Sequence, residues 1–187
     1  MEFNITNKVA LITGASRGIG CAIAQTLSAE GMRVALVARS QDLLDKLAAS
    51  LLTESLVIAT DLRHPTAPAD AVTTTLARFG SLDLLVNNAG ATKRGDFLDL
   101  TEEDWSDGFA LKFYSAVRCS RAAWKHLQVS HGSIINIIGV GGRTGSAEFA
   151  IGGAVNAALM NLTKVLADRG VKDGVGKVHF LLGEGFG

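Results

Sequence analysis

The sequence is poor in cysteine, proline and tyrosine, and neither sign of charge is in excess. Its 187 residues include 2 cysteines, 2 prolines and 1 tyrosine, against 21 glycines. Cys21 and Cys119 each fall within a predicted helix and outside any paired metal-ligand spacing, so we expect two core thiols and no metal site. The 48% share of apolar residues, with so little proline, excludes a disordered or collagen-like chain.

Two further absences concern partners and location. Eighteen basic residues balance eighteen acidic residues, so no global field would draw the chain to nucleic acid or to an anionic membrane. No basic segment followed by a long apolar run opens the chain, and no apolar stretch approaches the roughly 18 residues that cross a bilayer. We therefore expect a cytoplasmic protein without a nucleic-acid or membrane partner.

Short apolar segments alternate with amphipathic ones along the chain. The predicted strands cover residues 8–13, 33–38, 56–60, 82–87, 133–138 and 177–182. The predicted helices cover residues 19–30, 41–52, 67–79, 101–127 and 149–169; Thr101 caps the fourth, and Gly170 ends the fifth. Near-continuous apolar strands separated by helices predict a parallel sheet that is covered on both faces. The predicted fold is α/β, a doubly wound parallel sheet of the Rossmann type, in one domain over residues 1–187.

The segment TGASRGIG joins the first strand to the first helix. Its glycines let the backbone turn tightly and approach a pyrophosphate, and the helix that follows offers unpaired N–H groups and a positive dipole end. Such a turn could be purely structural, but its place at the head of a βα series is the setting of a dinucleotide fingerprint. The candidate cofactor-binding residues of this turn are Thr13, Gly14, Ser16, Arg17, Gly18, Ile19 and Gly20.

The end of the second strand bears on the choice of cofactor. An acidic residue there binds the ribose 2′-OH, whereas arginine accommodates a 2′-phosphate. The sequence has Arg39 and Ser40 at this point, with Arg17 as a second cation on the same side. NADP(H) is therefore predicted over NAD(H), although both arginines could instead be solvated surface charges.

Together, TGASRGIG, Asp61-Leu62 after the third strand and Asn87-Asn88-Ala89-Gly90 after the fourth resemble the short-chain dehydrogenase/reductase family. The resemblance runs from about residue 6 to about 182. It implies that the glycine turn holds the pyrophosphate, that Asp61 contacts the adenine with Leu62 in the same site, and that Asn88, Ala89 and Gly90 line the adenosine ribose. It also implies that the segment 87–90 stabilises the central sheet.

The resemblance implies an active site of Asn, Ser, Tyr and Lys, in which the tyrosine exchanges a proton with the substrate oxygen. Counted from the family's landmarks, these four positions fall at Lys112, Gly139, Gly152 and Asn156. All four residue types differ, and Tyr114 lies in the wrong helix to replace the tyrosine. The loop residues Thr144 and Ser146 are poor acids, and Arg143 and Glu148 are expected to be solvated.

Lys112 and Asn156 stand as if the asparagine and the lysine of the family had been exchanged. We take both as candidate catalytic residues: the Lys112 ammonium would replace the missing charge and Asn156 the amide. Chance substitution is the alternative. Two functions follow: an NADP(H)-dependent oxidoreductase of small carbonyl or alcohol substrates, with Lys112 or a water as the acid, or a catalytically silent cofactor-binding or oligomer-partner protein.

Two expectations concern assembly and the carboxyl end. As in the family, the helices 101–127 and 149–169 are expected to pair between subunits of a homo-oligomer. The resemblance implies a further strand after residues 177–182, where this chain ends in GEGFG. The sheet is thus expected to lack its last strand and to have an open edge, in a truncated or frame-altered product or in a natural short form.

Overall fold

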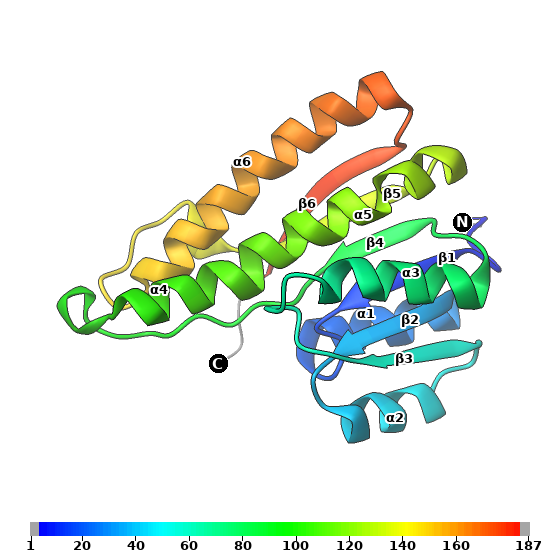
Figure 1. Cartoon of the computed structure of the whole chain (residues 1–187), viewed down its shortest axis with the longest axis horizontal. Helices are drawn as coiled ribbons and strands as arrows, with labels where there is room; N and C mark the ends of the chain where they lie inside the picture. The colour runs from blue at the N-terminus through cyan, green and yellow to red at the C-terminus, as the bar shows by residue number, and fades with distance from the viewer. Residues whose placement is uncertain (1–3, 184–187) are drawn as a thin grey trace.

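The computed structural model describes residues 4–183, and its centre is a six-stranded sheet in the order β3-β2-β1-β4-β5-β6 (Figure 1). The strands are β1 (Val9–Thr13), β2 (Arg33–Ala38), β3 (Ser55–Ala59), β4 (Leu84–Asn87), β5 (Ser133–Gly139) and β6 (Lys177–Gly183). Every neighbouring pair is parallel. The doubly wound α/β fold predicted from the sequence is confirmed, with the strand order reversing between β1 and β4.

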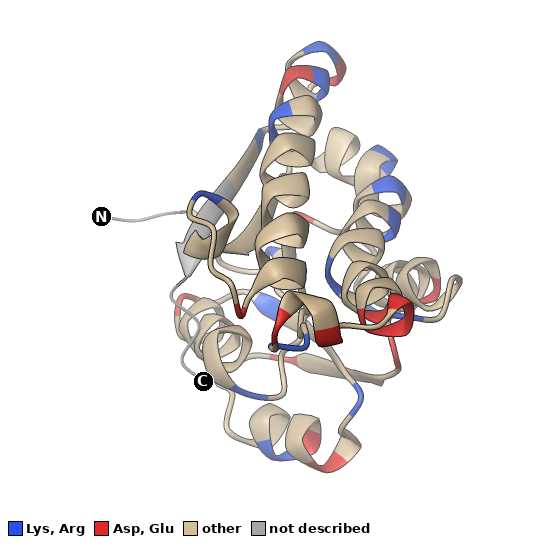
Figure 2. Cartoon of the chain, turned by 90° about the vertical axis from the view of Figure 1, so that its left-hand side faces the viewer, with Lys and Arg blue, Asp and Glu red and all other residues tan. Residues whose placement is uncertain are grey.

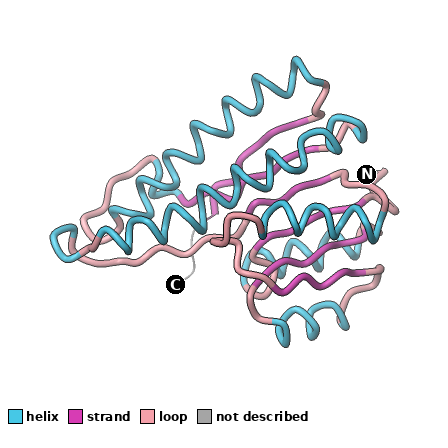
Figure 3. The backbone as a smooth tube through the Cα atoms, in the orientation of Figure 1, coloured by secondary structure: helices cyan, strands magenta, loops and turns pink. Residues whose placement is uncertain are grey.

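Helices cover both faces of the sheet (Figure 3). They are α1 (Gly18–Ala29), α2 (Gln41–Ala49), α3 (Ala67–Phe79), α4 (Glu102–Gly108), α5 (Ser115–Ser130) and α6 (Ala150–Asp173). Helices α3, α5 and α6 pack on one face, and α1 and α2 pack on the other. Because both faces are covered, all five residues of β1 are buried, which explains its uninterrupted apolar sequence.

The helical stretch predicted over residues 101–127 is present, but its interior is not regular α-helix. It begins as predicted, since the Thr101 hydroxyl accepts a hydrogen bond from the Asp104 N–H at 3.2 Å and the Asp104 carboxylate closes a capping box. After α4, however, residues Phe109–Tyr114 (η2) form a π-helical turn before α5 continues to Ser130. Two short 3-10 turns, η1 (Phe97–Asp99) and η3 (Val140–Gly142), complete the described elements.

Two predicted helix ends are also corrected. Helix α2 ends at Ala49 instead of residue 52. Gly170 does not end α6, because it is buried inside the helix, which continues to Asp173 and stops at Gly174 with a φ of 77°. Gly174 is the residue that supplies the left-handed cap, since only glycine adopts that conformation without steric cost.

Among the described residues, α6 is the helix long and apolar enough by length and composition to cross a membrane, contrary to the expectation that no stretch comes near. A helix packed on a sheet passes the same test, and α6 packs along β5 and β6 through Leu159, Leu166 and Ala167. Basic and acidic residues are interspersed over the side of the chain that Figure 2 shows.

Candidate functional site

A pocket of about 1000 Å³ lies along the carboxyl ends of the parallel strands. Its lining includes residues that directly follow five strands: Gly14 after β1, Arg39 after β2, Thr60 after β3, Asn88 after β4 and Val140 after β5. In doubly wound sheets, ligands bind at this edge and at the point where the strand order reverses. The volume is in the range of a small-molecule or cofactor site.

The glycine turn forms the floor of this pocket. Gly14 and Gly18 have φ values of 67° and 58°, the left-handed conformation that glycine allows. Helix α1 starts at Gly18 without a side-chain cap and without an acidic residue in its first turn. Its first N–H groups therefore have no side-chain acceptor, and the turn fits the pyrophosphate of a dinucleotide, an anion that such N–H groups bind.

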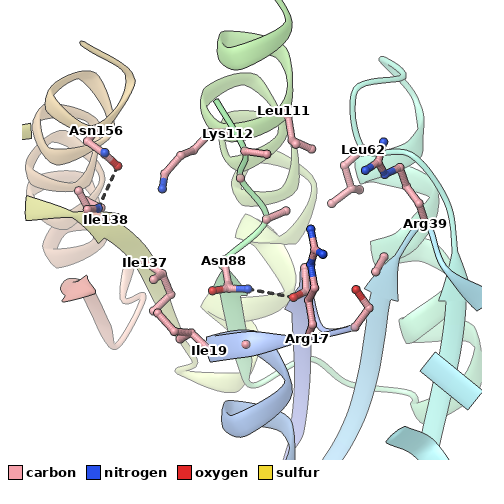
Figure 4. Close-up of a pocket in the computed structure, with 18 of the residues that line it drawn as sticks. Arg17, Ile19, Arg39, Leu62, Asn88, Leu111, Lys112, Ile137, Ile138 and Asn156 are labelled. Atoms are coloured by element: carbon pink, nitrogen blue, oxygen red, sulfur yellow. Dashed lines mark hydrogen bonds between the residues drawn. The ribbon is translucent and has the colours of Figure 1, made fainter. Parts of the chain in front are cut away.

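Thr13 and Asn88 join the turn to β4. The Thr13 hydroxyl accepts hydrogen bonds from the N–H groups of Asn88 and Ala89, both at 3.0 Å. The Asn88 amide donates to the carbonyl oxygens of Thr13 at 3.1 Å and Gly14 at 3.0 Å (Figure 4). Thr13 is buried and does not line the pocket, so its role is to fix the glycine turn against the residues that follow β4.

Arg17 and Arg39 both line the pocket, on the side away from Lys112 and Asn156 (Figure 4). Ser40 lines the same end, and Arg39 forms no ion pair within the described range. Asp61 is close by, but it pairs with Arg63, which also binds Asp107 of α4 through two hydrogen bonds.

The charges in this cluster shift the pKa of two members. Burial raises the pKa of Asp61, but the hydrogen bonds and charge of Arg63 lower it, and the net pKa lies below the ordinary value. The hydrogen bond to Asp107 raises the pKa of Arg63 above its ordinary value. Both groups are therefore charged at neutral pH, and the charge of Asp61 is engaged by Arg63.

The opposite end of the pocket carries Lys112 and Asn156 (Figure 4). Lys112 lies in the π-helical turn and points toward Asn156, and it forms no hydrogen bond or ion pair with any described residue. Burial lowers the pKa of Lys112. Asn156 is buried, and its Oδ1 accepts the Gly139 N–H at 2.9 Å, which leaves the amide N–H₂ group without an acceptor in the described range.

Two of the glycines at this end are packed by neighbouring side chains. A Cβ added at Gly152 would come within 2.1 Å of the Phe149 ring, and one added at Gly139 would come within 2.9 Å of Asn156 Nδ2. The guanidinium of Arg94 lies over the Phe149 ring, 4.4 Å from its centroid. Phe149 and Asn156 thus fill the space that side chains at 152 and 139 would need.

The pocket brings together most of the residues predicted from the sequence. Those that line it are Gly14, Ser16, Arg17, Gly18, Ile19, Arg39, Ser40, Asp61, Leu62, Asn88, Ala89, Gly90, Lys112 and Asn156. Thr13 and Gly20 do not line it; Gly20 faces the turn, because a Cβ there would lie 2.3 Å from the Gly14 carbonyl oxygen. Thr144 and Ser146 line the pocket, whereas Arg143 and Glu148 are exposed outside it.

Sequence reasoning missed Arg94 and Phe149, which both line the pocket. The available signals were a cation four residues after Gly90 and a large aromatic residue at the start of α6.

Comparison with known proteins gives a consistent family. The family model described as short chain dehydrogenase matches residues 8–181. The 3-oxoacyl-[acyl-carrier-protein] reductase of Escherichia coli is 34% identical over 168 residues, covering 88% of this chain and 68% of the relative. The meso-2,3-butanediol dehydrogenase of Serratia marcescens is 34% identical over 173 residues, covering 90% and 68%.

Solved structures agree with the fold. A short chain dehydrogenase from Burkholderia cenocepacia in complex with NADP matches with a TM-score of 0.90 and 32% identity, covering 95% of this chain and 74% of that chain. A short-chain dehydrogenase from Streptomyces avermitilis matches with a TM-score of 0.87 and 36% identity, covering 96% and 65%. The chain spans about two thirds of the length of the curated relatives it matches.

Proposed function

The chain belongs to the short chain dehydrogenase family, and we propose that it binds NADP(H) in the pocket along the strand ends and acts as an oxidoreductase on small carbonyl or alcohol substrates. The observation that carries the cofactor choice is the pair of Arg17 and Arg39 at one end of the pocket. Asp61 pairs with Arg63 and interacts with Arg39 only through its charge at longer range, so the guanidinium N–H groups of Arg39 are open to a 2′-phosphate. The presence of NADP in the Burkholderia relative supports the same choice.

The residues of the pocket divide the binding between them. The backbone N–H groups at the start of α1 would hold the pyrophosphate, Arg39, Ser40 and Arg17 the 2′-phosphate, and Asp61 with Leu62 the adenine. Asn88, Ala89 and Gly90 would line the adenosine ribose. When bound, the reduced nicotinamide supplies a hydride.

Lys112 is the proposed general acid. Its Nζ has no described partner, and a pKa lowered by burial makes its ammonium a better acid than an exposed lysine. The amide N–H₂ of Asn156 would donate a hydrogen bond to the ribose or to the substrate oxygen, because its Oδ1 is already bound to Gly139. Lys112 thus donates the proton that the oxygen of a reduced carbonyl needs.

A catalytically silent cofactor-binding protein is the second candidate function. The packing of Phe149 against Gly152, and of Asn156 against Gly139, favours it, because the positions at which the family resemblance implies tyrosine and serine are filled by other side chains. The two candidates share the cofactor site and differ in turnover.

We also propose a homo-oligomer through the helical segments predicted over residues 101–127 and 149–169, that is, through α5, which forms the second part of the first segment, and α6. An apolar groove of about 410 Å³ lies between them. Its lining includes Val117, Trp124, Leu162 and Leu166. A second copy that presents the same groove would bury these side chains.

Titration of the purified protein with NADPH and NADH tests the cofactor proposal. NADPH is expected to bind more tightly, and Arg39→Ala is expected to remove about 1.5–3 kcal/mol of NADPH binding because a charge-assisted contact is lost. Arg143→Ala is the matched control, since Arg143 is an exposed loop arginine outside the pocket. Equal affinity of the parent chain for both cofactors contradicts the proposal.

Loss of NADPH absorbance with a panel of ketones and aldehydes separates the two functions. Turnover that disappears in Lys112→Met supports the oxidoreductase. A chain that binds NADPH normally and turns over nothing supports the silent protein. Turnover that survives Lys112→Met contradicts the role of Lys112.

A further inference from the structure

Cations dominate the end of the pocket that lies away from Arg17 and Arg39. Lys112 and Arg94 both line the pocket, and Thr144 and Ser146 add hydroxyl groups. Asp61 is the one acidic residue among the lining residues described, and it is paired with Arg63 at the adenosine end. A ligand at the Lys112 end therefore meets positive charge without a carboxylate to offset it.

Arg94 is oriented by an aromatic ring instead of an acid. Its guanidinium lies 4.4 Å from the centroid of the Phe149 ring, and it forms no ion pair within the described residues. Stacking on a ring face leaves the planar N–H groups of arginine free to bind a carboxylate bidentately. Because the stack already restricts the Arg94 side chain, less conformational entropy is lost when a ligand binds.

Phe149 is itself held in a narrow place. A Cβ at Gly141 would come within 2.8 Å of its ring and one at Gly152 within 2.1 Å, so the ring lies directly against both backbones. The loop that carries Arg94 is joined to the loop before α6 by the hydrogen bond from Gly95 N–H to the Glu148 carbonyl oxygen at 3.2 Å. The two loops therefore present Arg94 from a defined position.

Lys112 supplies the second cation. It is half-buried and has no described hydrogen-bond or ion-pair partner, so its charge has a desolvation cost that no protein group offsets. An anion in the pocket would offset part of that cost, whereas a neutral ligand would not.

We propose that this end of the pocket selects a carbonyl compound that carries a carboxylate, that is, a small oxo acid anion. Arg94, held over Phe149, binds the carboxylate, and Lys112 faces the carbonyl oxygen. The inference rests on the proposed function for the carbonyl group, while the carboxylate preference rests on Arg94 and Lys112. Arg94 is thus a specificity-determining residue and Phe149 is a positioning residue.

Calorimetric titration with matched probes tests this proposal with and without NADP⁺, the oxidised cofactor, which cannot reduce either probe. Acetoacetate is the anionic probe, and its methyl ester is the neutral probe of nearly the same shape. Acetoacetate is expected to bind about tenfold or more tightly than the ester, as a charge-assisted contact gives. Arg94→Gln is expected to remove that preference, and Phe149→Leu to reduce it, since the stack no longer orients the guanidinium.

Arg143→Gln is the matched control and is expected to leave the preference unchanged, because Arg143 lies outside the pocket lining. Equal binding of acetoacetate and its ester, in both the free and the NADP⁺-loaded protein, overturns the proposal. So does a preference that Arg94→Gln leaves intact. If inorganic phosphate competes as strongly as acetoacetate, the carboxylate selection is overturned. Failure of NADPH to bind counts against the proposed function alone, because the preference is also measured without cofactor.

Discussion

Gly18 and Gly20 are two residues apart in the same turn but have different surroundings. A Cβ at Gly18 would meet no atom within 4 Å, while one at Gly20 would lie 2.3 Å from the Gly14 carbonyl oxygen and 2.5 Å from Asn88 Nδ2. Gly18 lines the pocket and Gly20 does not. The first glycine therefore leaves room for a ligand, and the second lets α1 approach the turn.

Alanine substitutions separate these two roles. Gly18→Ala is expected to weaken NADPH binding, because its Cβ projects into open pocket space, and to lower the free energy of unfolding by about 1–2 kcal/mol through the left-handed φ. Gly20→Ala is expected to lower it by about 3 kcal/mol, since backbone atoms must move apart. Urea unfolding and NADPH titration of both variants give the comparison. A larger stability loss at Gly18 than at Gly20 would contradict the assignment.

Lys112 gives a prediction about pH. Its pKa in the folded chain is lower than in the unfolded chain, so between the two values the unfolded chain binds more protons and stability rises with pH. At neutral pH the cost of the buried charge is present in full. Lys112→Met is therefore expected to raise the free energy of unfolding at neutral pH, with the gain shrinking as pH approaches 10.5, the ordinary lysine value.

Urea unfolding of parent and variant at several alkaline pH values measures this difference. Comparing the two chains at each pH cancels the opposite slope of Cys119, whose pKa burial raises to about 12. Lys46→Met, at an exposed position of α2, is the control. A Lys112→Met chain that is less stable than its parent at neutral pH would show that Lys112 has a stabilising partner.

Residue positions that depend on a motif could be predicted from the sequence, and those that depend on packing could not. The glycine turn, Arg39 and Asn88 all line the pocket as expected, because strand ends fix where such residues lie. Arg94 and Phe149 meet through two loops that are far apart in the chain, and no local pattern encodes that contact. The inward roles of Thr13 and Gly20 likewise depend on neighbours from β4 and the turn.

At the scale of elements, a buried polar network ties strands to helices. The Asn87 amide donates to Asn136 Oδ1 at 2.9 Å and to Ser120 Oγ at 3.2 Å, and the Asn136 amide donates to Thr163 Oγ1 at 2.8 Å. The chain of contacts thus links β4 and β5 with α5 and α6. Since these groups are buried, each lost partner leaves an unsatisfied polar atom.

Asn136→Ala is expected to lower the free energy of unfolding by about 1–3 kcal/mol because its partners lose a buried hydrogen bond. In a double-mutant cycle with Asn87→Ala, the two effects are expected to be non-additive by about 0.5–3 kcal/mol, as for residues in one network. Chemical denaturation of the parent, the two single variants and the double variant supplies the four values. Strict additivity would mean that the two asparagines act independently.

The pattern of apolar residues predicted the strands and most helices within a few residues. Buried strands are apolar throughout, whereas a helix that covers a sheet is apolar on one face, so the two kinds of element differ in their apolar period. The pattern could not predict the π-helical turn Phe109–Tyr114, since backbone hydrogen bonding within a helix leaves no mark on the apolar period. The end of α6 was missed for a related reason: Gly170 is a buried packing position, and the capping glycine comes four residues later at Gly174.

For the whole molecule, the parallel sheet determines where the site lies. Strands β1 and β4 are neighbours in the sheet although 70 residues separate Thr13 from Leu84 along the chain, and the crossover on each side leaves their carboxyl ends open. The glycine turn, Arg39 and Lys112 all line the pocket at that edge of the sheet. Although basic and acidic residues are equal in number over the whole chain, basic side chains line both ends of the pocket.

If α5 and α6 pair between copies, the groove lined by Val117 and Leu166 is buried in the oligomer. A carboxylate placed there would lose its hydration, so Val117→Glu and Leu166→Glu are expected to raise the dissociation constant by about a hundredfold or more.

Val129→Glu is the control, because Val129 is 84% exposed and lies outside the groove. Sedimentation velocity over a range of concentrations, with urea unfolding to verify that each variant is folded, measures the effect. A parent chain that sediments as a monomer throughout, or folded groove variants that assemble as the parent does, would exclude this interface.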